Sequence, residues 1–211
     1  LATSLIEVGD MDLKHETANN LDMGLKYRSD NVRFDVALFY NQIDDYIFLR
    51  NSGAYYEETP VFHYAQQNTS FSGYELDFEY LLDASASQQW GFNIFADGTR
   101  AKLNTGKNVP RIPADRWGVG VNWHNGGWSA GISHSHVMSQ NDVAISELPT
   151  DGYNLLGFNI SWLYQGSNLE TLIFIKGNNL LNEEIRDHAS FIKDLAPNPG
   201  RSFTAGFRLT F

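Results

Sequence analysis

The feature that most limits what this chain can fold into is an alternation of apolar and polar residues that recurs along most of its length. At the carboxyl end one parity is apolar and the other polar: Phe203, Ala205, Phe207, Leu209 and Phe211 against Ser202, Thr204, Gly206, Arg208 and Thr210. The same split occurs over 21–28, 74–82 and 117–123. Because successive side chains of a β-strand point to opposite faces, the pattern predicts strands with one apolar and one polar face. The chain is therefore expected to be all-β.

Nine strands are expected, joined by connections that alternate between short and long. The expected strands are 20–29, 31–48, 62–82, 89–103, 115–124, 127–138, 153–164, 168–178 and 201–211. Short connections such as Asn125-Gly126-Gly127 are rich in residues that accept tight hairpin geometry. Long connections are expected at 49–61, 104–114, 139–152 and 179–200. Tight turns on one rim and long loops on the other are typical of an antiparallel transmembrane β-barrel, whereas a soluble β-sandwich, the alternative, need not alternate in this way.

The positions of the aromatic residues support the barrel interpretation. Seven of them lie within a few residues of a short turn and predict a girdle at one membrane interface: Tyr27, Tyr80, Trp90, Trp123, Trp128, Trp162 and Tyr164. The expected strand 31–48 is roughly 59 Å long at 3.3 Å per residue, so it must project beyond an apolar band about 25 Å tall. Its alternation also fails near residues 43–46. His134 and His136 share the parity of Trp128 and are therefore expected on the lipid-facing side rather than in a metal site.

Composition and charge exclude several functions. The formal net charge of −10 argues against a nucleic-acid partner, and the absence of cysteine excludes disulfides and thiolate metal sites. No motif of a hydrolase or phosphate-binding enzyme is present, and Ser133 to His136 alternate between opposite faces of one strand. The chain is therefore not expected to be an enzyme.

Strand counting suggests that the chain is one part of a larger barrel. A barrel in lipid must be closed, because an open edge leaves unpaired amides in hydrocarbon, and bacterial single-chain barrels have an even number of strands. Nine strands that end on the short-turn side are therefore expected to form the carboxyl-terminal part of a larger barrel, with residues 1–19 belonging to a preceding outer loop. If residues 1–12 form a tenth strand instead, a small self-contained barrel acting as a pore or adhesin becomes possible.

Several strings in this order resemble a known family. The segment Leu13-Lys14-His15-Glu16-Thr17, the run Asn178-Asn179-Leu180-Leu181-Asn182, and Pro199-Gly200-Arg201-Ser202-Phe203 with a terminal Phe211 resemble TonB-dependent outer-membrane receptors. His15 stands where the family usually has proline, and Asn178 stands where aspartate is common. Residues 187–191 and 64–73 look most like the zinc-uptake receptors.

This resemblance implies an architecture and a set of partners. It implies a 22-stranded barrel in the outer membrane of a Gram-negative bacterium, with residues 1–211 as its carboxyl-terminal part and without the plug domain. The implied partners are the remaining strands and plug of the same receptor, the TonB energy-transducing complex acting through the absent plug, lipid and lipopolysaccharide. The implied cargo is a metal ion or metal chelate, with no cofactor required. The terminal Phe211 is expected to serve as the assembly signal of the barrel.

Two places in the outer loops carry residues suited to zinc. Without cysteine, zinc is bound by imidazole and carboxylate oxygen, which directs attention to the six histidines. His188 with Asp187 in the last long loop, and His63 with Glu58, are the candidate ligands, and an ordinary solvated acidic loop is the alternative for both. The outer segments are acidic overall, so a negative mouth that attracts cations is also expected.

Overall fold

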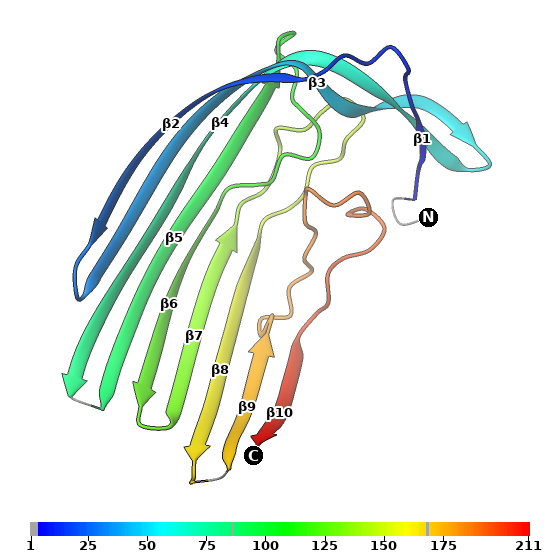
Figure 1. Ribbon diagram of the computed structural model, residues 1–211. Coiled ribbons are helices and arrows are strands. Elements are labelled where there is room, and N and C mark those ends of the chain that lie inside the picture. Colours follow the sequence, from blue (N-terminus) through cyan, green and yellow to red (C-terminus); the bar gives the residue numbers. More distant parts are fainter. Residues whose placement is uncertain (1–3, 86, 168) are drawn as a thin grey trace.

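The computed structural model describes residues 4–85, 87–167 and 169–211. Nine antiparallel strands form one curved, open sheet, in which every strand pairs with its neighbours in sequence (Figure 1). In chain order the strands of this sheet are β2 (Thr17–Arg28), β3 (Val32–Tyr56), β4 (Thr59–Ser85), β5 (Gln88–Leu103), β6 (Arg116–Asn125), β7 (Trp128–Val137), β8 (Tyr153–Gln165), β9 (Glu170–Asn178) and β10 (Ser202–Thr210). The nine predicted strands are thereby confirmed, with shifted ends. Among the described residues, no helix is long and apolar enough to cross a membrane.

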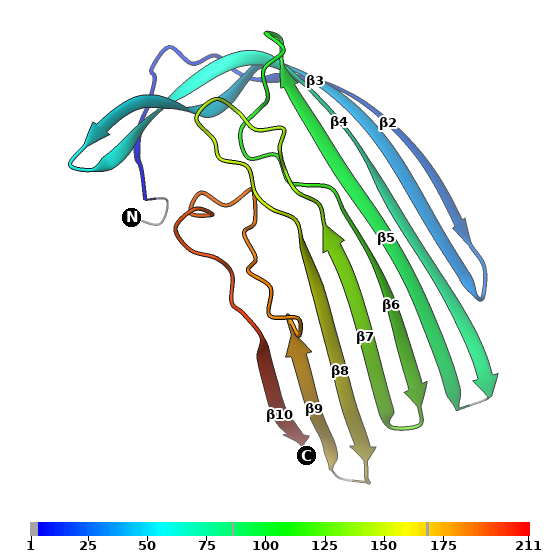
Figure 2. The same cartoon turned by 180° about the vertical axis from the view of Figure 1, so that it is seen from behind.

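The connections alternate in length as predicted, with one exception. Tight turns join β2 to β3, β4 to β5, β6 to β7 and β8 to β9 at one rim, and long loops leave the other rim (Figures 1 and 2). These are the β5–β6 loop (residues 104–115), the β7–β8 loop (residues 138–152) and the β9–β10 loop (residues 179–201). The prediction of a fourth long connection at 49–61 is wrong, because β3 and β4 continue through these residues as a hairpin. That hairpin turns at Glu57 and Glu58, whose φ angles of 45° and 64° are those of a tight turn.

A β-bulge explains why alternation failed at residues 43–46. The pairing of β3 with β4 jumps from Ile43↔Thr69 to Tyr46↔Gln67, so β3 contains one residue more than β4 across the step. One extra residue exchanges the two faces of a strand. Before the bulge, odd-numbered residues of β3 such as Phe39 lie on the inner, polar face of the sheet. After the bulge the even-numbered Tyr46 and Phe48 lie on this face, where they pack with Phe71. Residues 46–67, which we call the outer hairpin, therefore carry no uninterrupted two-residue pattern, and their length could not be read from the sequence.

The two faces of the sheet differ as the alternation predicted. Between the rims, one face exposes large apolar side chains, including Leu38, Ile94, Val119, Ile132 and Phe207. The opposite face carries the ion pairs Arg33–Glu79 and Arg116–Asp97. On the apolar face near the tight turns, aromatic rings pair across strands: Trp90 with Trp123 at 6.3 Å and Trp128 with Trp162 at 6.2 Å between centroids. Trp117 lies 5.8 Å from His134 and 6.0 Å from His136, which places both histidines on this face as predicted.

Phenylalanines on the polar face lie over glycines of the adjacent strand. Phe39 is paired with Gly73, Phe95 with Gly118 and Phe174 with Gly206. A Cβ added at Gly73 would be 2.3 Å from the Phe39 ring and 2.4 Å from the carbonyl oxygen of Gly98. Each glycine therefore leaves the space in which a ring covers the neighbouring backbone, a device known from other β-proteins. This arrangement allows apolar rings on an otherwise polar wall.

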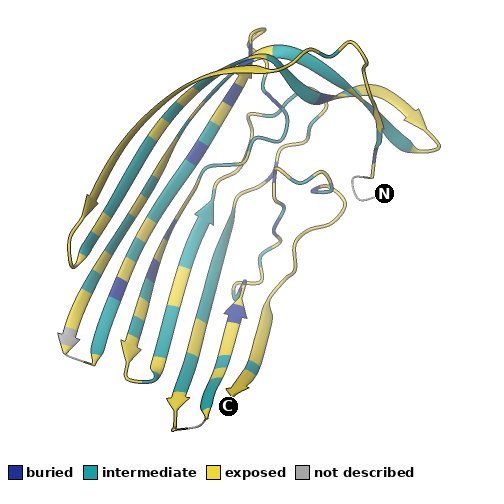
Figure 3. Cartoon of the chain, viewed as in Figure 1, coloured by how far each residue is buried: buried dark blue, intermediate teal, exposed yellow. Residues whose placement is uncertain are grey.

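Buried apolar side chains gather at the long-loop end, whereas the buried positions farther along β5 and β6 in Figure 3 are glycines. Ala101, Leu103 and Val109 form a small cluster with Tyr46 and Phe48 packed against it. Leu49 of the outer hairpin and Ile185 of the β9–β10 loop are also buried. The loops and the outer hairpin thus form a compact unit of their own, and that unit is where a rigid site can be built.

The amino-terminal segment does not pair with β2, so it does not extend the row of nine antiparallel strands. Its strand β1 (Ile6–Val8) has three residues and pairs in parallel with Val61–His63 of β4, off the sheet path. A tenth barrel strand over residues 1–12 is therefore wrong for the described residues from 4 onward, because β1 pairs with the projecting outer hairpin instead of β2. Phe211 follows β10 and is 98% exposed; its role in assembly stays a prediction.

The division into two faces can be tested in the intact barrel by a pair of neighbouring substitutions. Ile132→Lys on the apolar face is expected to lower the free energy of unfolding by about 2–4 kcal/mol, the cost of a lysine near the middle of a bilayer. Ser133→Lys, on the opposite face of the same strand, is the control and is expected to cost much less. Urea unfolding in lipid vesicles measures both, and equal losses would contradict the assignment of faces.

Candidate functional site

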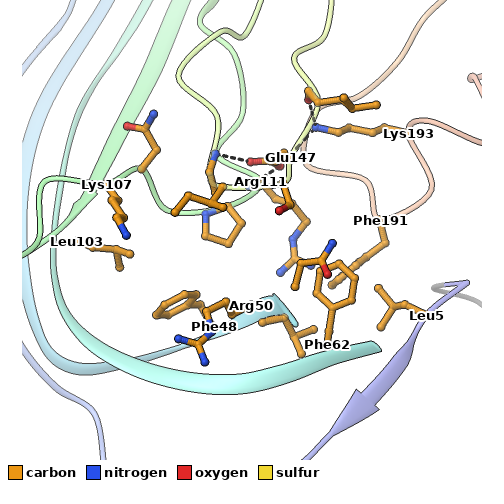
Figure 4. A pocket seen from close by; sticks show the side chains of 18 of the residues that line it. Leu5, Phe48, Arg50, Phe62, Leu103, Lys107, Arg111, Glu147, Phe191 and Lys193 are labelled. Atoms are coloured by element: carbon orange, nitrogen blue, oxygen red, sulfur yellow. Dashed lines mark hydrogen bonds and ion pairs between the residues drawn. The ribbon is translucent and has the colours of Figure 1, made fainter. Parts of the chain in front are cut away.

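A cavity of about 400 Å³ lies between the outer hairpin and the three long loops (Figure 4). The outer hairpin supplies one wall with Phe48 and Phe62, and the loops supply the opposite wall. Leu5, next to β1, closes one side beside Phe191. The other lining residues are Leu49, Arg50, Asn51, Gln67, Leu103, Thr105, Lys107, Asn108, Pro110, Arg111, Ala144, Ile145, Ser146, Glu147, Leu148, Ser190, Lys193 and Asp194. Polar and charged residues therefore make up just over half of the lining, and apolar and aromatic residues make up the rest.

The carboxylate of Glu147 holds the three loops together. Its Oε1 accepts a hydrogen bond from the backbone amide of Arg111 in the β5–β6 loop, at 3.0 Å. The same oxygen lies 3.3 Å from both Lys193 Nζ and His188 Nε2 of the β9–β10 loop. Oε2 accepts from the amide of Ala144 at 3.0 Å within its own loop. One carboxylate thus fixes the relative positions of all three loops.

Lys193 and His188 complete a buried cluster around this carboxylate. Lys193 is 4% exposed and His188 is 3% exposed. Lys193 Nζ donates to the carbonyl of Leu148 at 2.7 Å and lies 3.2 Å from His188 Nδ1. Nδ1 also lies 3.0 Å from the hydroxyl of Thr150. With its proton on Nε2, the imidazole donates to Glu147 and accepts at Nδ1, so both ring nitrogens are engaged.

These contacts keep Glu147 ionised. Burial by itself raises the pKa of this carboxyl group, but the hydrogen bonds from His188 and the Ala144 amide and the charge of Lys193 outweigh it. The net effect lowers the pKa from 4.5 to about 2. The Glu147 cluster, which consists of Glu147, His188, Lys193 and Thr150, is therefore a charged anchor at neutral pH.

Arg111 presents its guanidinium to the cavity. Its φ of 59° turns the chain between Pro110 and Ile112, and its amide is the one bound by Glu147. The guanidinium carbon lies 3.5 Å from the centroid of the Phe191 ring, a cation–π contact between two loops (Figure 4). Burial lowers the pKa of this half-buried arginine, although an arginine remains charged at neutral pH. No carboxylate lies within 4.0 Å of it in the described part of the chain.

The cavity lining carries more positive than negative charge. Four cationic residues, Arg50, Lys107, Arg111 and Lys193, stand against Glu147 and Asp194. Lys193 and Glu147 neutralise one another, and Arg50 and Lys107 are exposed. The acidic outer segments predicted a negatively charged entrance, but the lining of this cavity carries more positive than negative charge. Chemically, the lining suits a molecule with anionic oxygens and a flat apolar or aromatic body.

The structure does not bring the predicted metal ligands together. His188 is buried in the Glu147 cluster, whereas Asp187 next to it is exposed. His63 is exposed on the outer hairpin and pairs with Arg50 and Val8, and Glu58 lies in the turn of the same hairpin. No group of three or more His, Asp or Glu side chains able to hold a metal ion occurs among the residues that the structure describes. Zinc binding by these four residues stays a prediction.

Sequence reasoning missed Glu147, Arg111 and Lys193. In the sequence Glu147 is one acid among many in the acidic outer segments, and its partners Arg111 and Lys193 lie 36 and 46 residues away along the chain. The single local signal was the spacing Pro110-Arg111-Ile112-Pro113, in which two prolines hold a basic residue in a stiff turn.

Comparison with known proteins identifies the family. The family model "TonB dependent receptor-like, beta-barrel" matches residues 2–180. The chain therefore belongs to the TonB-dependent receptor β-barrel family, as its motifs predicted. Receptors of this family are outer-membrane transporters of Gram-negative bacteria and not enzymes.

Solved structures show the same fold. The structure of "Copper transporter OprC" matches with a TM-score of 0.75 and 18% identity over 95% of this chain and 32% of that one. The FrpB iron transporter from Neisseria meningitidis gives 0.66 and 15%, covering 96% and 32%. The siderophore receptor PirA from Acinetobacter baumannii gives 0.65 and 17%, covering 95% and 32%. The chain thus spans about a third of the length of the solved receptors it matches.

The role of Glu147 predicts a pH dependence of loop order. Because its pKa is lowered, the stabilisation is complete above pH 4.5 and is lost as the pH falls towards 2. The shift corresponds to on the order of 3 kcal/mol.

At neutral pH, Glu147→Gln is expected to speed amide hydrogen exchange in residues 138–152 and 179–201. Glu184→Gln, which removes only a surface ion pair with Arg186, is the control. Equal exchange in the two variants would contradict the anchor.

Proposed function

We propose that this chain is the carboxyl-terminal part of a TonB-dependent receptor that takes up a metal chelate across the outer membrane, and that the loop cavity receives the cargo. The observation that carries the proposal is the cavity itself. It lies at the long-loop end of the sheet, and it combines aromatic walls with the half-buried guanidinium of Arg111, which has no carboxylate within 4.0 Å among the described residues. Fold and family support an uptake receptor, and the chemistry of the lining supports the kind of cargo.

A chelate suits the cavity better than a bare cation. A divalent cation needs several oxygen or imidazole ligands that converge on one point. The lining instead carries an excess of positive charge, which repels a free cation and attracts the anionic oxygens of a ligand wrapped around a metal. The rings of Phe48, Phe62 and Phe191 provide apolar area for the body of such a ligand.

The open sheet supports a larger receptor rather than a small barrel. Strands β2 and β10 lie at opposite ends of the described sheet, and each pairs with one neighbour (Figure 1). In a membrane these edges require partners, and further strands of the same receptor would supply them. A self-contained pore or adhesin, the second interpretation, would require β2 and β10 to pair with each other. The proposed longer protein, with 22 strands and a plug, would also provide the contact with the TonB complex.

Arg111 offers the sharpest test of the cargo class. In the intact receptor, Arg111→Ala is expected to weaken binding of a ferric tris-catecholate complex at least 10-fold, the equivalent of one charge-assisted contact of about 1.4 kcal/mol. Arg201→Ala, an exposed arginine outside the cavity lining, is the matched control and is expected to bind like the parent. Equilibrium titration of tryptophan fluorescence provides the measurement. Unchanged affinity in Arg111→Ala would refute the assignment of this cavity to an anionic chelate.

Zinc, which the resemblance to the zinc-uptake receptors suggests, is a narrower candidate for the cargo, with His188, Asp187, His63 and Glu58 as candidate ligands. Ligation by His188 would require the Glu147 cluster to open, because both ring nitrogens are engaged. We therefore expect equilibrium binding of Zn²⁺ alone to be equal in the intact receptor and its His188→Ala variant. A zinc affinity that falls 10-fold or more in the variant would instead support zinc as cargo and His188 as its ligand.

A further inference from the structure

A groove of about 410 Å³ lies on the apolar face of the sheet and shares no residue with the loop cavity. Three adjacent strands form it with two side chains each: Val121 and Trp123 of β6, Ala130 and Ile132 of β7, and Phe158 and Ile160 of β8. We call it the Ala130 groove. It lies near the tight-turn end of these strands, because Trp128 and Trp162, which pair beside the turns, are only two residues from Ala130 and Ile160.

The groove exists because one small residue is surrounded by large ones. Ala130 pairs with Trp123 on one side and with Ile160 on the other. Its neighbours on the same face of its own strand are Trp128 and Ile132. A single methyl group among four large side chains leaves a hollow in an otherwise filled surface.

The width of the hollow favours a single hydrocarbon chain as its occupant. Trp123 and Ile160 belong to the strands on either side of β7, so their backbones are about 10 Å apart. Their own side chains narrow this space, and an α-helix with side chains is already about 10–12 Å across. An unbranched acyl chain carries no side groups and can lie along the strands. Lipid is also what this face meets in an outer-membrane receptor.

Trp123 supplies a hydrogen-bond donor beside the hollow. Its ring lies 6.3 Å from the ring of Trp90, and its Nε1 is buried without a hydrogen-bond partner among the residues that the structure describes. A buried indole N–H normally has an acceptor. No hydrogen bond opposes a turn of the ring that brings its N–H to an acceptor in the groove. Tryptophans near a membrane interface lie at the level of the headgroups, so an ester carbonyl of a phospholipid is an acceptor within reach.

The tight turns next to the groove carry no group that selects a charged headgroup. Residues 83–91, 122–130 and 162–170 contain no lysine and no arginine. These are the residues that attract anionic lipids and bind phosphate. Recognition at this place therefore depends on the acyl chain and its ester group rather than on headgroup charge.

We propose that the Ala130 groove binds one acyl chain of a phospholipid from the periplasmic leaflet, and that the indole N–H of Trp123 donates to an ester carbonyl of the same lipid. The leaflet follows from the position of the groove, because the tight turns of outer-membrane barrels face the periplasm. A lipid bound here stabilises the folded barrel, as any ligand of the native state does. The site is independent of the cargo, so it stands or falls separately from the proposed function.

Filling the groove tests the proposal in the intact receptor. Native mass spectrometry in detergent with added palmitoyl-oleoyl phosphatidylethanolamine measures the lipid concentration at which half of the receptor carries one lipid. Ala130→Leu fills the hollow and keeps the face apolar, and it is expected to raise this concentration at least 10-fold. Ala96→Leu, the same change on the apolar face of β5 outside the groove, is the control and is expected to bind like the parent. Equal values for the two variants overturn the site, and urea unfolding shows that both are folded.

Two further measurements separate the parts of the proposal. Trp123→Phe keeps the ring and removes the N–H, and it is expected to weaken binding about 3-fold; parental affinity overturns the hydrogen bond. Phosphatidylglycerol with the same chains is expected to bind as tightly as phosphatidylethanolamine, and a 10-fold preference for it overturns recognition of the chain. If a second copy of the receptor occupies the groove instead, Ala130→Leu separates a dimer and leaves lipid binding unchanged, which also overturns the site.

Discussion

The backbone hydrogen-bond ladder that runs without interruption from β2 to β10 is the constraint on which the rest of the structure depends. Hydrocarbon offers no partners to amides, so every strand that crosses it must be paired on both sides. That pairing fixes the face of the sheet on which each side chain lies. A single sheet of this kind has no buried core of its own. Apolar side chains can then face lipid on one side while ion pairs such as Arg33–Glu79 line the other. The loops at the rim do not have to cover a core of the sheet, and they build the site.

Within the loops, one buried carboxylate has the corresponding organising role. Glu147 is ionised because Lys193, His188 and two backbone amides compensate for the loss of water around it. Removing one partner from such a cluster leaves a buried charge uncompensated, which is far costlier than breaking a surface ion pair. The cluster therefore positions Arg111 and Phe191 across the cavity as a pair. It also uses His188 for structure, a role that competes with metal binding.

Alternation was a reliable guide wherever the sheet separates two different environments. It located nine strands and assigned His134 and His136 to the apolar face, where four of the five tryptophans lie near the tight turns. It failed beyond residue 43, where the bulge at Asp44 and Asp45 exchanges the faces of β3 and where both sides of the outer hairpin meet loops or water. Alternation of apolar and polar residues reflects a difference in environment between the two faces of a strand, so it is absent where both faces have the same environment.

By itself, the sequence determined the all-β architecture, the order and orientation of the strands and membership of the receptor family, because these depend on local periodicity and short motifs. Only the tertiary structure decided the site. His188 and Asp187 are adjacent in sequence, yet one is buried beside Glu147 and the other is exposed. The charge of the cavity likewise depends on which residues from four separated segments face one another. Such contacts are set by how the loops pack over the rim, which no periodicity in the chain encodes.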